Sequence, residues 1–151
     1  MVSRVRAPLS LVGLLAGLVG VGALGGCFEP IDGGACRSDR DCSEAVCSNV
    51  GECASATYRL RVAWTLRGAT ANTPGACDGI SELEIVVSDP STGMEFSVRP
   101  VPCAIGSFLF DKMPPGYGAV AVNAYGSGGQ LVSTGRGSTD PSVGAVNVDL
   151  R

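Results

Sequence analysis

Cysteine is the residue type that gives this sequence most of its chemical options. The chain of 151 residues contains seven cysteines and no histidine. The cysteines are Cys27, Cys36, Cys42, Cys47, Cys53, Cys77 and Cys103. A thiolate can be alkylated, can bind a metal ion or can form a disulfide bond. Without histidine, the usual base of serine and cysteine triads and the imidazole ligands of most zinc and iron sites are missing. We therefore expect modification or cross-linking of sulfur rather than histidine-based catalysis.

A basic and then apolar segment opens the chain. Arg4 and Arg6 precede the uncharged run 9–26, which is rich in glycine. This order is typical of a bacterial export signal that is removed after use. Each glycine weakens a helix by roughly 0.5–1 kcal/mol relative to alanine, so we expect a short and weak signal-peptide helix within residues 1–26. A retained membrane anchor is the alternative, although such an anchor normally needs about 20 apolar residues.

The apolar run ends in the tetrapeptide Leu24-Gly25-Gly26-Cys27. It resembles the lipobox of bacterial lipoproteins, in which a leucine and two small residues precede a cysteine. The resemblance implies that signal peptidase II recognises Leu24, Gly25 and Gly26. It also implies cleavage before Cys27, a diacylglycerol thioether on the Cys27 sulfur and an acylated amino terminus. Two or three acyl chains anchor a protein durably, whereas one binds marginally. The alternative is an ordinary cleaved signal that leaves Cys27 as a disulfide partner.

The residue after the cysteine bears on the destination of the protein. Phe28 stands where an aspartate retains well-studied lipoproteins in the inner membrane. The resemblance therefore implies the outer membrane, on its periplasmic or surface face, with residues 27–35 as a lipidated spacer. The formal net charge is −3, and loss of Arg4 and Arg6 makes it more negative. A negative chain stays clear of anionic headgroups.

Six cysteines remain once Cys27 is assigned to a lipid, and an even number suits three disulfide bonds in an oxidising compartment. Their spacing separates a local group of four from a distant pair. The pairs that we favour within the local group are Cys36–Cys47 and Cys42–Cys53. The segment 36–54 is too small to bury a core, so cross-links must replace one.

The beginning of this segment resembles small cysteine-rich modules of secreted proteins, which start with the pattern C-x-S-D-x-D-C. The matching residues are Cys36, Ser38, Asp39, Asp41 and Cys42. The resemblance implies a disulfide knot and transfers no function. Zinc is disfavoured because the segment has no C-x2-C pair and the chain has no histidine. Calcium at Asp39, Asp41 and Glu44 is also disfavoured, since the ligand order of an EF-hand loop is missing. We expect solvated turn carboxylates and no metal site.

Alternation of apolar and polar residues begins at Thr57 and is typical of half-buried strands. The expected strands are 57–66, 82–88, 94–99, 107–111, 117–125, 130–136 and 143–150. Trp64 keeps phase with Leu60 and Val62, so we expect it in the core. Met94 is expected to face inward, together with every second residue that follows it in the strand 94–99. Short strands separated by Gly, Pro and Asp turns predict a mainly β fold, an antiparallel sandwich of about seven strands over residues 57–151.

The stretch FLFDKMPPGY at 108–117 is similar to the F-x-L-P-P-G-x-Y-x-V-x-V stretch of carboxypeptidase-regulatory-like and other transthyretin-like sandwiches. Tyr117 follows Gly116 directly, which departs from that pattern, and Val120 and Val122 follow in alternating phase. The prolines end a strand because they cannot donate a ladder hydrogen bond. The resemblance implies a structural or binding domain without catalysis.

The distant pair of cysteines flanks the expected hairpin 82–88 and 94–99. Cys77 precedes its first strand and Cys103 follows its second, so both lie at the open end of the hairpin. We therefore expect a Cys77–Cys103 disulfide. In the chain-entropy model, a cross-link over this length stabilises a domain by roughly 3.5 kcal/mol.

No motif in the sequence predicts catalysis or a cofactor. The glycine-rich stretch 126–129 lacks the lysine and hydroxyl residue of a phosphate-binding loop, which favours a hairpin turn. Glu82 and Glu84 lie two apart on a strand and share its outward face, so they do not flank a glycosidic bond. Lys112 lies in the proline turn with no sign of burial. The net charge of −3 and the pI near 4.8 argue against a nucleic-acid partner.

These features predict a lipid-anchored protein of the cell envelope with a non-catalytic structural or protein-interaction sandwich. Its partners would be the membrane, through the lipid, and an envelope protein. One alternative is a saccharide- or peptide-binding module that uses the loops at one end of the sandwich. A second alternative is a small protease inhibitor that presents the cysteine-rich segment 36–54.

Overall fold

The computed structural model describes residues 36–151, so the expected signal-peptide helix and spacer lie outside the described residues. Two one-turn 3-10 helices are η1 (Asp39–Asp41) and η2 (Cys103–Ile105). The strands are β1 (Val46–Cys47), β2 (Cys53–Ala54), β3 (Tyr58–Leu66), β4 (Ala69–Thr70), β5 (Glu82–Ser88), β6 (Glu95–Val101), β7 (Ser107–Met113), β8 (Ala119–Tyr125), β9 (Leu131–Ser138) and β10 (Ala145–Leu150). Among residues 36–151, we find no helix with the length and apolar character that a membrane crossing requires.

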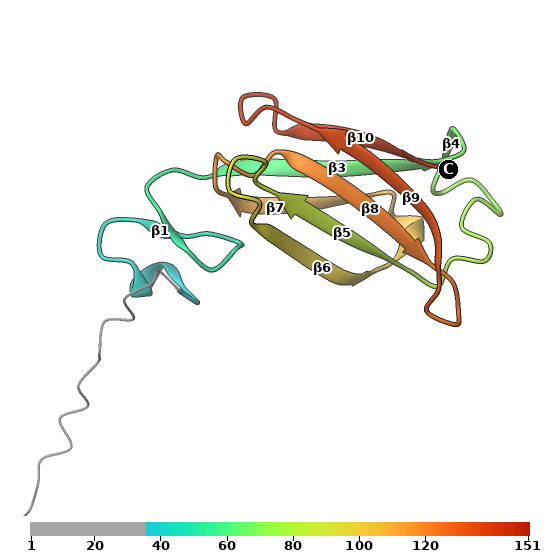
Figure 1. Ribbon diagram of the computed structural model, residues 1–151, viewed down its shortest axis with the longest axis horizontal. Coiled ribbons are helices and arrows are strands. Elements are labelled where there is room, and N and C mark those ends of the chain that lie inside the picture. Colours follow the sequence, from blue (N-terminus) through green and yellow to red (C-terminus); the bar gives the residue numbers. More distant parts are fainter. Residues whose placement is uncertain (1–35) are drawn as a thin grey trace, which may run out of the picture. The chain divides into compact units, whose positions relative to one another are not determined.

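The strands form one small hairpin and two larger sheets (Figure 1). The hairpin joins β1 to β2 within the cysteine-rich segment. In the first larger sheet, β3 pairs with β10 along one edge and with β7 and β4 along the other. The second larger sheet has the order β6-β5-β8-β9. The mainly β, sandwich-like fold expected from the sequence is therefore confirmed.

The core lies between the two larger sheets and follows the alternation of the sequence. On β3, every second residue from Leu60 to Leu66 is buried, and Trp64 is only 3% exposed. The largest side chains that are fully buried are Leu60, Leu83, Ile85, Met113, Leu150, Val62, Val87, Val101, Val122 and Val148. Burial of such aliphatic side chains stabilises a fold by about 1.5–3 kcal/mol each, so both sheets depend on this shared layer.

All seven expected strands are present, as β3 and β5 to β10, with ends that shift by a few residues. Two expectations about residues at the start of a strand were wrong. Met94 is 46% exposed, because β6 begins at Glu95 and Met94 belongs to the turn before it. Tyr117 also lies before its expected strand, β8, although its ring is buried.

The sandwich is also not wholly antiparallel, because β10 runs parallel to β3. After β9, the chain leaves the second sheet and enters the first, so β10 does not form a hairpin with its neighbour in sequence. At this crossing β9 approaches β10 closely, and Gly135 and Gly137 are the residues of β9 at the closest approach. A Cβ atom at Gly135 would lie 2.5 Å from Val148 Cγ1, and one at Gly137 would lie 2.6 Å from Val146 Cγ2. Glycine is therefore required where β9 crosses β10.

Candidate functional site

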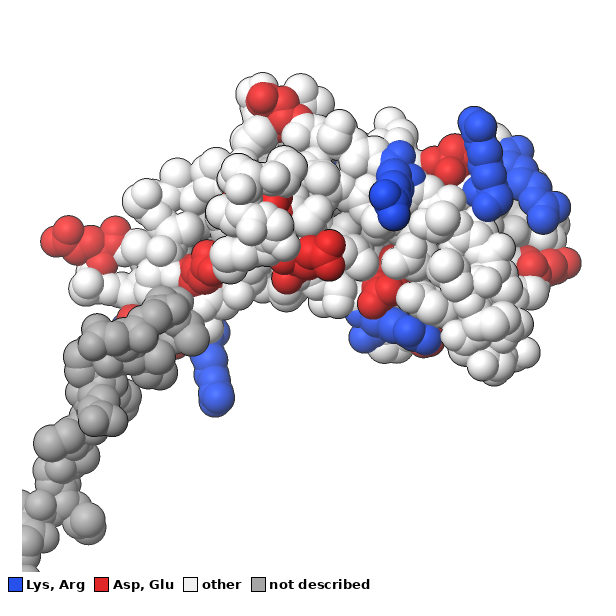
Figure 2. All heavy atoms as spheres, viewed as in Figure 1, with Lys and Arg blue, Asp and Glu red and all other residues white. Residues whose placement is uncertain are grey.

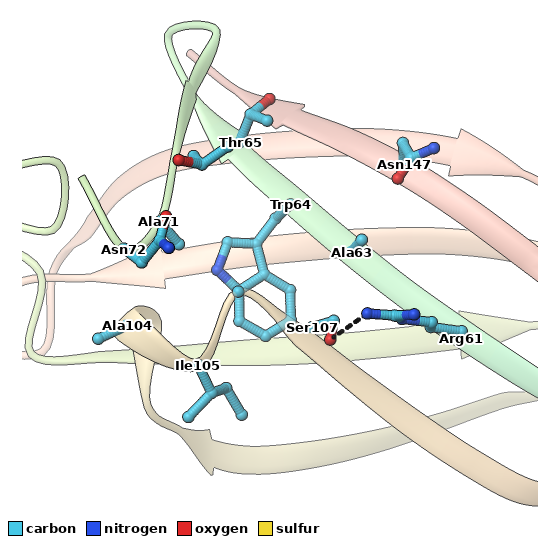
Figure 3. A pocket seen from close by; sticks show the side chains of 12 residues that line it. Arg61, Ala63, Trp64, Thr65, Ala71, Asn72, Ala104, Ile105, Ser107 and Asn147 are labelled. Carbon is cyan, nitrogen blue, oxygen red and sulfur yellow. Dashed lines mark hydrogen bonds between the residues drawn. The ribbon is translucent and has the colours of Figure 1, made fainter.

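The first candidate site is a gap along one edge of β3. The pairing of β7 with β3 ends at Ala63, and the pairing of β4 begins at Thr65, on the same side of β3. Trp64 lies between them, and its backbone N–H donates to Gly106 O at 3.1 Å. A pocket of about 380 Å³ opens at this gap. We call it the notch pocket (Figure 3). It is lined by Arg61, Ala63, Trp64, Thr65, Thr70, Ala71, Asn72, Ala104, Ile105, Gly106, Ser107 and Asn147.

The two walls of the notch pocket are joined to each other. One wall is the loop that follows β4, and the other is η2. The Cys77–Cys103 disulfide links that loop to η2. The indole Nε1 of Trp64 donates to Cys103 O at 2.9 Å, which fixes the back of the pocket to the same wall. These bonds hold the pocket in its shape without a ligand.

The notch pocket combines polar and apolar surface, and only one of its lining residues carries a charge. Arg61 is exposed, and its Nη2 atom donates to Ser107 Oγ at 3.3 Å. Within residues 36–151, no carboxylate forms an ion pair with Arg61. The Asn72 and Asn147 side chains also make no hydrogen bond to the described part of the chain, while Ile105 is 52% exposed. This set of side chains can bind a ligand, but it offers no carboxylate, thiol or amine for acid–base or nucleophilic chemistry.

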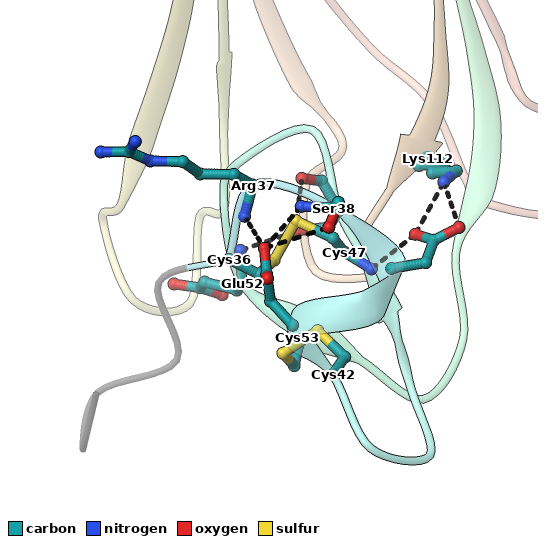
Figure 4. The surroundings of a disulfide bond; sticks show 11 residues. Cys36, Arg37, Ser38, Cys42, Cys47, Glu52, Cys53 and Lys112 are labelled. Carbon is teal, nitrogen blue, oxygen red and sulfur yellow. Dashed lines mark hydrogen bonds and ion pairs between the residues drawn. A yellow bond between two sulfur atoms is a disulfide. The ribbon is translucent and has the colours of Figure 1, made fainter. Parts of the chain in front are cut away.

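The second candidate site is the cysteine-rich segment (Figure 4). It contains the Cys36–Cys47 and Cys42–Cys53 disulfides, which are the pairs that the sequence favoured. The Cys77–Cys103 pair expected for the sandwich is present as well. The Sγ atoms of Cys36, Cys42 and Cys53 lie within 4.8 Å of one another. Each of them is bonded to another sulfur, so none is a thiolate that could hold a metal ion.

The aspartates of this segment are occupied by internal hydrogen bonds. Asp41 Oδ2 accepts the backbone N–H groups of Arg37 and Ser38, each at 2.8 Å, and these bonds lower the pKa of the Asp41 carboxyl. Asp39 accepts from Lys112 Nζ and from the backbone N–H of Cys47. The contact with Lys112 is the largest cause of a lowered Asp39 pKa. Both carboxylates therefore stabilise the turn at the start of the segment.

Lys112 is half-buried and lies in β7, not in the proline turn that the sequence predicted for it. Together with Asn49 it joins the cysteine-rich segment to the edge of β7, a contact that the sequence did not predict. Lys112 Nζ lies 2.8 Å from both carboxylate oxygens of Asp39. The backbone N–H of Asn49 donates to Lys112 O at 2.9 Å, and Asn49 Oδ1 accepts from Lys112 N at 2.7 Å. Asn49 therefore pairs with Lys112 much as a residue of a neighbouring strand would, with its side-chain Oδ1 in the place of a backbone carbonyl oxygen. The contact covers one end of an otherwise free sheet edge.

The other residues singled out in the sequence have structural roles. Glu84 accepts from Asn123 Nδ2 and Tyr125 Oη on the outward face of the second sheet, and these bonds lower its pKa. Glu82 forms an ion pair with Arg99. The stretch 126–129 is the turn between β8 and β9, as expected. Leu24, Gly25, Gly26 and Cys27 lie outside the described residues.

Charge is distributed without a continuous basic surface on the face shown in Figure 2. Lysine and arginine side chains are interspersed there with aspartate and glutamate. The chain as a whole carries a net charge of −3. Neutralising a nucleic-acid backbone needs a clustered positive surface, which this face does not offer.

Comparison with known proteins gives no relative from which a role could be transferred: no protein-family model, no curated protein and no solved structure matches the chain.

Proposed function

We propose that the chain is an exported lipoprotein of the cell envelope, anchored through a lipid on Cys27, and that its sandwich-like domain is a non-catalytic structural or protein-interaction module. The pairing of cysteines carries this proposal. All six cysteines among residues 36–151 form three disulfides, which leaves Cys27 as the single remaining thiol of the chain. Disulfides of this kind persist in oxidising compartments outside the cytoplasm.

The chemistry of the described sites supports a binding role over catalysis. The notch pocket has hydroxyl, amide and guanidinium groups but no base to activate a nucleophile. The carboxylates of Glu82 and Glu84 are engaged by Arg99, Tyr125 and Asn123. These contacts account for both carboxylates as parts of the outward face of the second sheet.

The exposed side chains favour a protein partner over a saccharide. Saccharide sites often use an exposed aromatic ring as a platform. Among the described aromatic residues none is fully exposed: Trp64, Tyr117 and Phe110 are at most 4% exposed, and Tyr58, Phe96, Phe108 and Tyr125 are half-buried. The large apolar side chains that are exposed in the described part are aliphatic: Met94, Ile105, Leu109, Leu131, Val132 and Val143. Aliphatic surface of this kind suits contact with another polypeptide.

Labelling of the protein in its bacterial envelope tests the anchor. Radiolabelled palmitate should enter the wild-type protein and be lost in the variant Cys27→Ala. The double variant Cys42→Ser with Cys53→Ser is the matched control, because it also removes sulfur but leaves the lipobox intact. Mass spectrometry of the wild type should show residues 1–26 removed and acyl chains added. Recovery of the full-length polypeptide without a lipid, or labelling that persists in Cys27→Ala, contradicts the anchor.

A pull-down from detergent-solubilised envelope tests the interaction role. A stoichiometric envelope protein should accompany the wild-type protein. The same protein should accompany the variant Cys27→Ala, which has no site for the lipid, in the same detergent. If the wild-type protein is recovered without a partner, at its own mass, under the mildest solubilisation, this result contradicts the interaction role and leaves the anchor proposal unaffected.

A further inference from the structure

The notch pocket is preformed, and this distinguishes it from an ordinary surface hollow. Gly106 lies in the left-handed region at a φ of 69°, and a Cβ at this position would lie 3.6 Å from the Cβ of Ala71 on the opposite wall. The Cys77–Cys103 disulfide prevents these walls from separating. A pocket that is already ordered loses little conformational entropy when it binds a ligand.

The positive charge of the notch pocket favours a ligand with a negative charge. Arg61 is the only charged residue of the lining, and the single hydrogen bond that its guanidinium makes to the described residues goes to Ser107 Oγ. A guanidinium has five N–H donors in a planar fork that matches a carboxylate. Most donors of Arg61 are therefore free for a ligand, and the lining contains no acidic residue to repel or compete with an anion.

The remaining lining divides into amide and apolar parts. Asn72 and Asn147 reach the rim from the β4 loop and from β10, as Figure 3 shows. Ala63 provides apolar surface beside Arg61, and Ile105 provides apolar surface on the other side of the Trp64 indole, next to η2. A ligand that fits both parts carries one acidic group and an adjoining apolar body.

We propose that the notch pocket binds a small organic carboxylate with an apolar or aromatic group, whose acidic end pairs with Arg61 and whose apolar end lies against Ile105. This inference does not depend on the lipid anchor. Charge-assisted, bidentate pairs are the strongest hydrogen bonds that a surface arginine makes. Most of the selectivity should therefore come from Arg61.

The single tryptophan of the chain is a local probe for this proposal, because Trp64 lines the pocket. Benzoate and its neutral isostere benzamide are titrated into the detergent-purified protein while Trp64 emission is followed. Backbone amide shifts of Gly106 and Asn147 by NMR give a second readout that does not require the indole to be touched. We expect benzoate to bind saturably and at least about tenfold more tightly than benzamide.

Two arginine variants identify the residue responsible. Arg61→Gln should reduce benzoate binding to the level of benzamide, with no loss of thermal stability because the side chain is exposed. Arg136→Gln is the matched control, since Arg136 is also exposed and belongs to β9 in the other sheet. The proposal is overturned if benzoate and benzamide bind equally, if Arg61→Gln and Arg136→Gln have the same effect, or if neither readout responds to benzoate.

Discussion

The cysteine-rich segment and the sandwich domain maintain their structures by different means. In residues 36–54, the buried apolar cluster consists of Cys36, Cys42 and Cys47, with Ala45 packed against it. In the sandwich, buried aliphatic side chains from both sheets form one continuous core, and a single disulfide lies at its end. A short segment cannot remove enough apolar surface from water, whereas two facing sheets can. Cross-links therefore replace a core in one region and supplement it in the other.

The largest expected effect comes from a cavity in the sandwich core. Leu83 is fully buried, and Leu83→Ala should lower the free energy of unfolding by about 2–5 kcal/mol. The matched control is Leu131→Ala, because Leu131 is 55% exposed and its removal creates no cavity. Denaturant unfolding followed by Trp64 fluorescence measures the free energy of unfolding of both variants. A comparable loss from Leu131→Ala would show that burial between the sheets is not what stabilises the domain.

Removal of disulfides sharpens the comparison, with an expected loss inside the range given for Leu83→Ala and below its upper end. The Cys77–Cys103 bond spans 26 residues, and its double serine variant should lose about 3.5 kcal/mol in the Trp64 transition. The Cys42–Cys53 bond spans 11 residues, and its loss should unfold the cysteine-rich segment while leaving the Trp64 transition unchanged. Protease cleavage within residues 36–54 reports that local unfolding. Equal shifts of the Trp64 transition in both variants would mean that the regions unfold as one unit.

The smallest effect concerns the contact between the two regions. Lys112 lowers the pKa of Asp39, so Lys112→Gln should raise that pKa toward its ordinary value. A carboxyl whose pKa is lowered by folding adds stability above its ordinary pKa of 3.8 and loses it as the pH falls through the folded value. The pH dependence of stability below about 4 should therefore weaken in the variant.

Asp41 is the internal control for this titration. Backbone N–H groups of Arg37 and Ser38 lower its pKa, and neither depends on Lys112. NMR titration of the two carboxyl groups should therefore show a shift at Asp39 alone. A parallel shift at Asp41 would indicate that Lys112→Gln disturbs the whole cysteine-rich segment.

Local patterns were sufficient to predict the seven longer strands and most of their buried faces, but not the two-residue strands β1, β2 and β4. The alternation around Leu60 places that face in the core because a strand in contact with another layer buries every second residue. The partners of the strands were less accessible to prediction. The parallel alignment of β10 with β3 depends on where β9 crosses, and Met94 is exposed because β6 begins one residue later than the alternation suggests. Neither feature leaves a periodic signal.

The sequence alone indicated the seven strands of the sandwich other than β4, the turns between them and the favoured cysteine pairs, because alternation, proline and glycine placement and cysteine spacing act over short distances along the chain. Only the tertiary structure decided what those elements bring together. Asn49 meets Lys112 across 63 residues, and the notch pocket collects side chains from β3, the β4 loop, η2 and β10. Such contacts depend on which strand edges are left unpaired once both sheets have closed on their common core, and this is a property of the assembled fold.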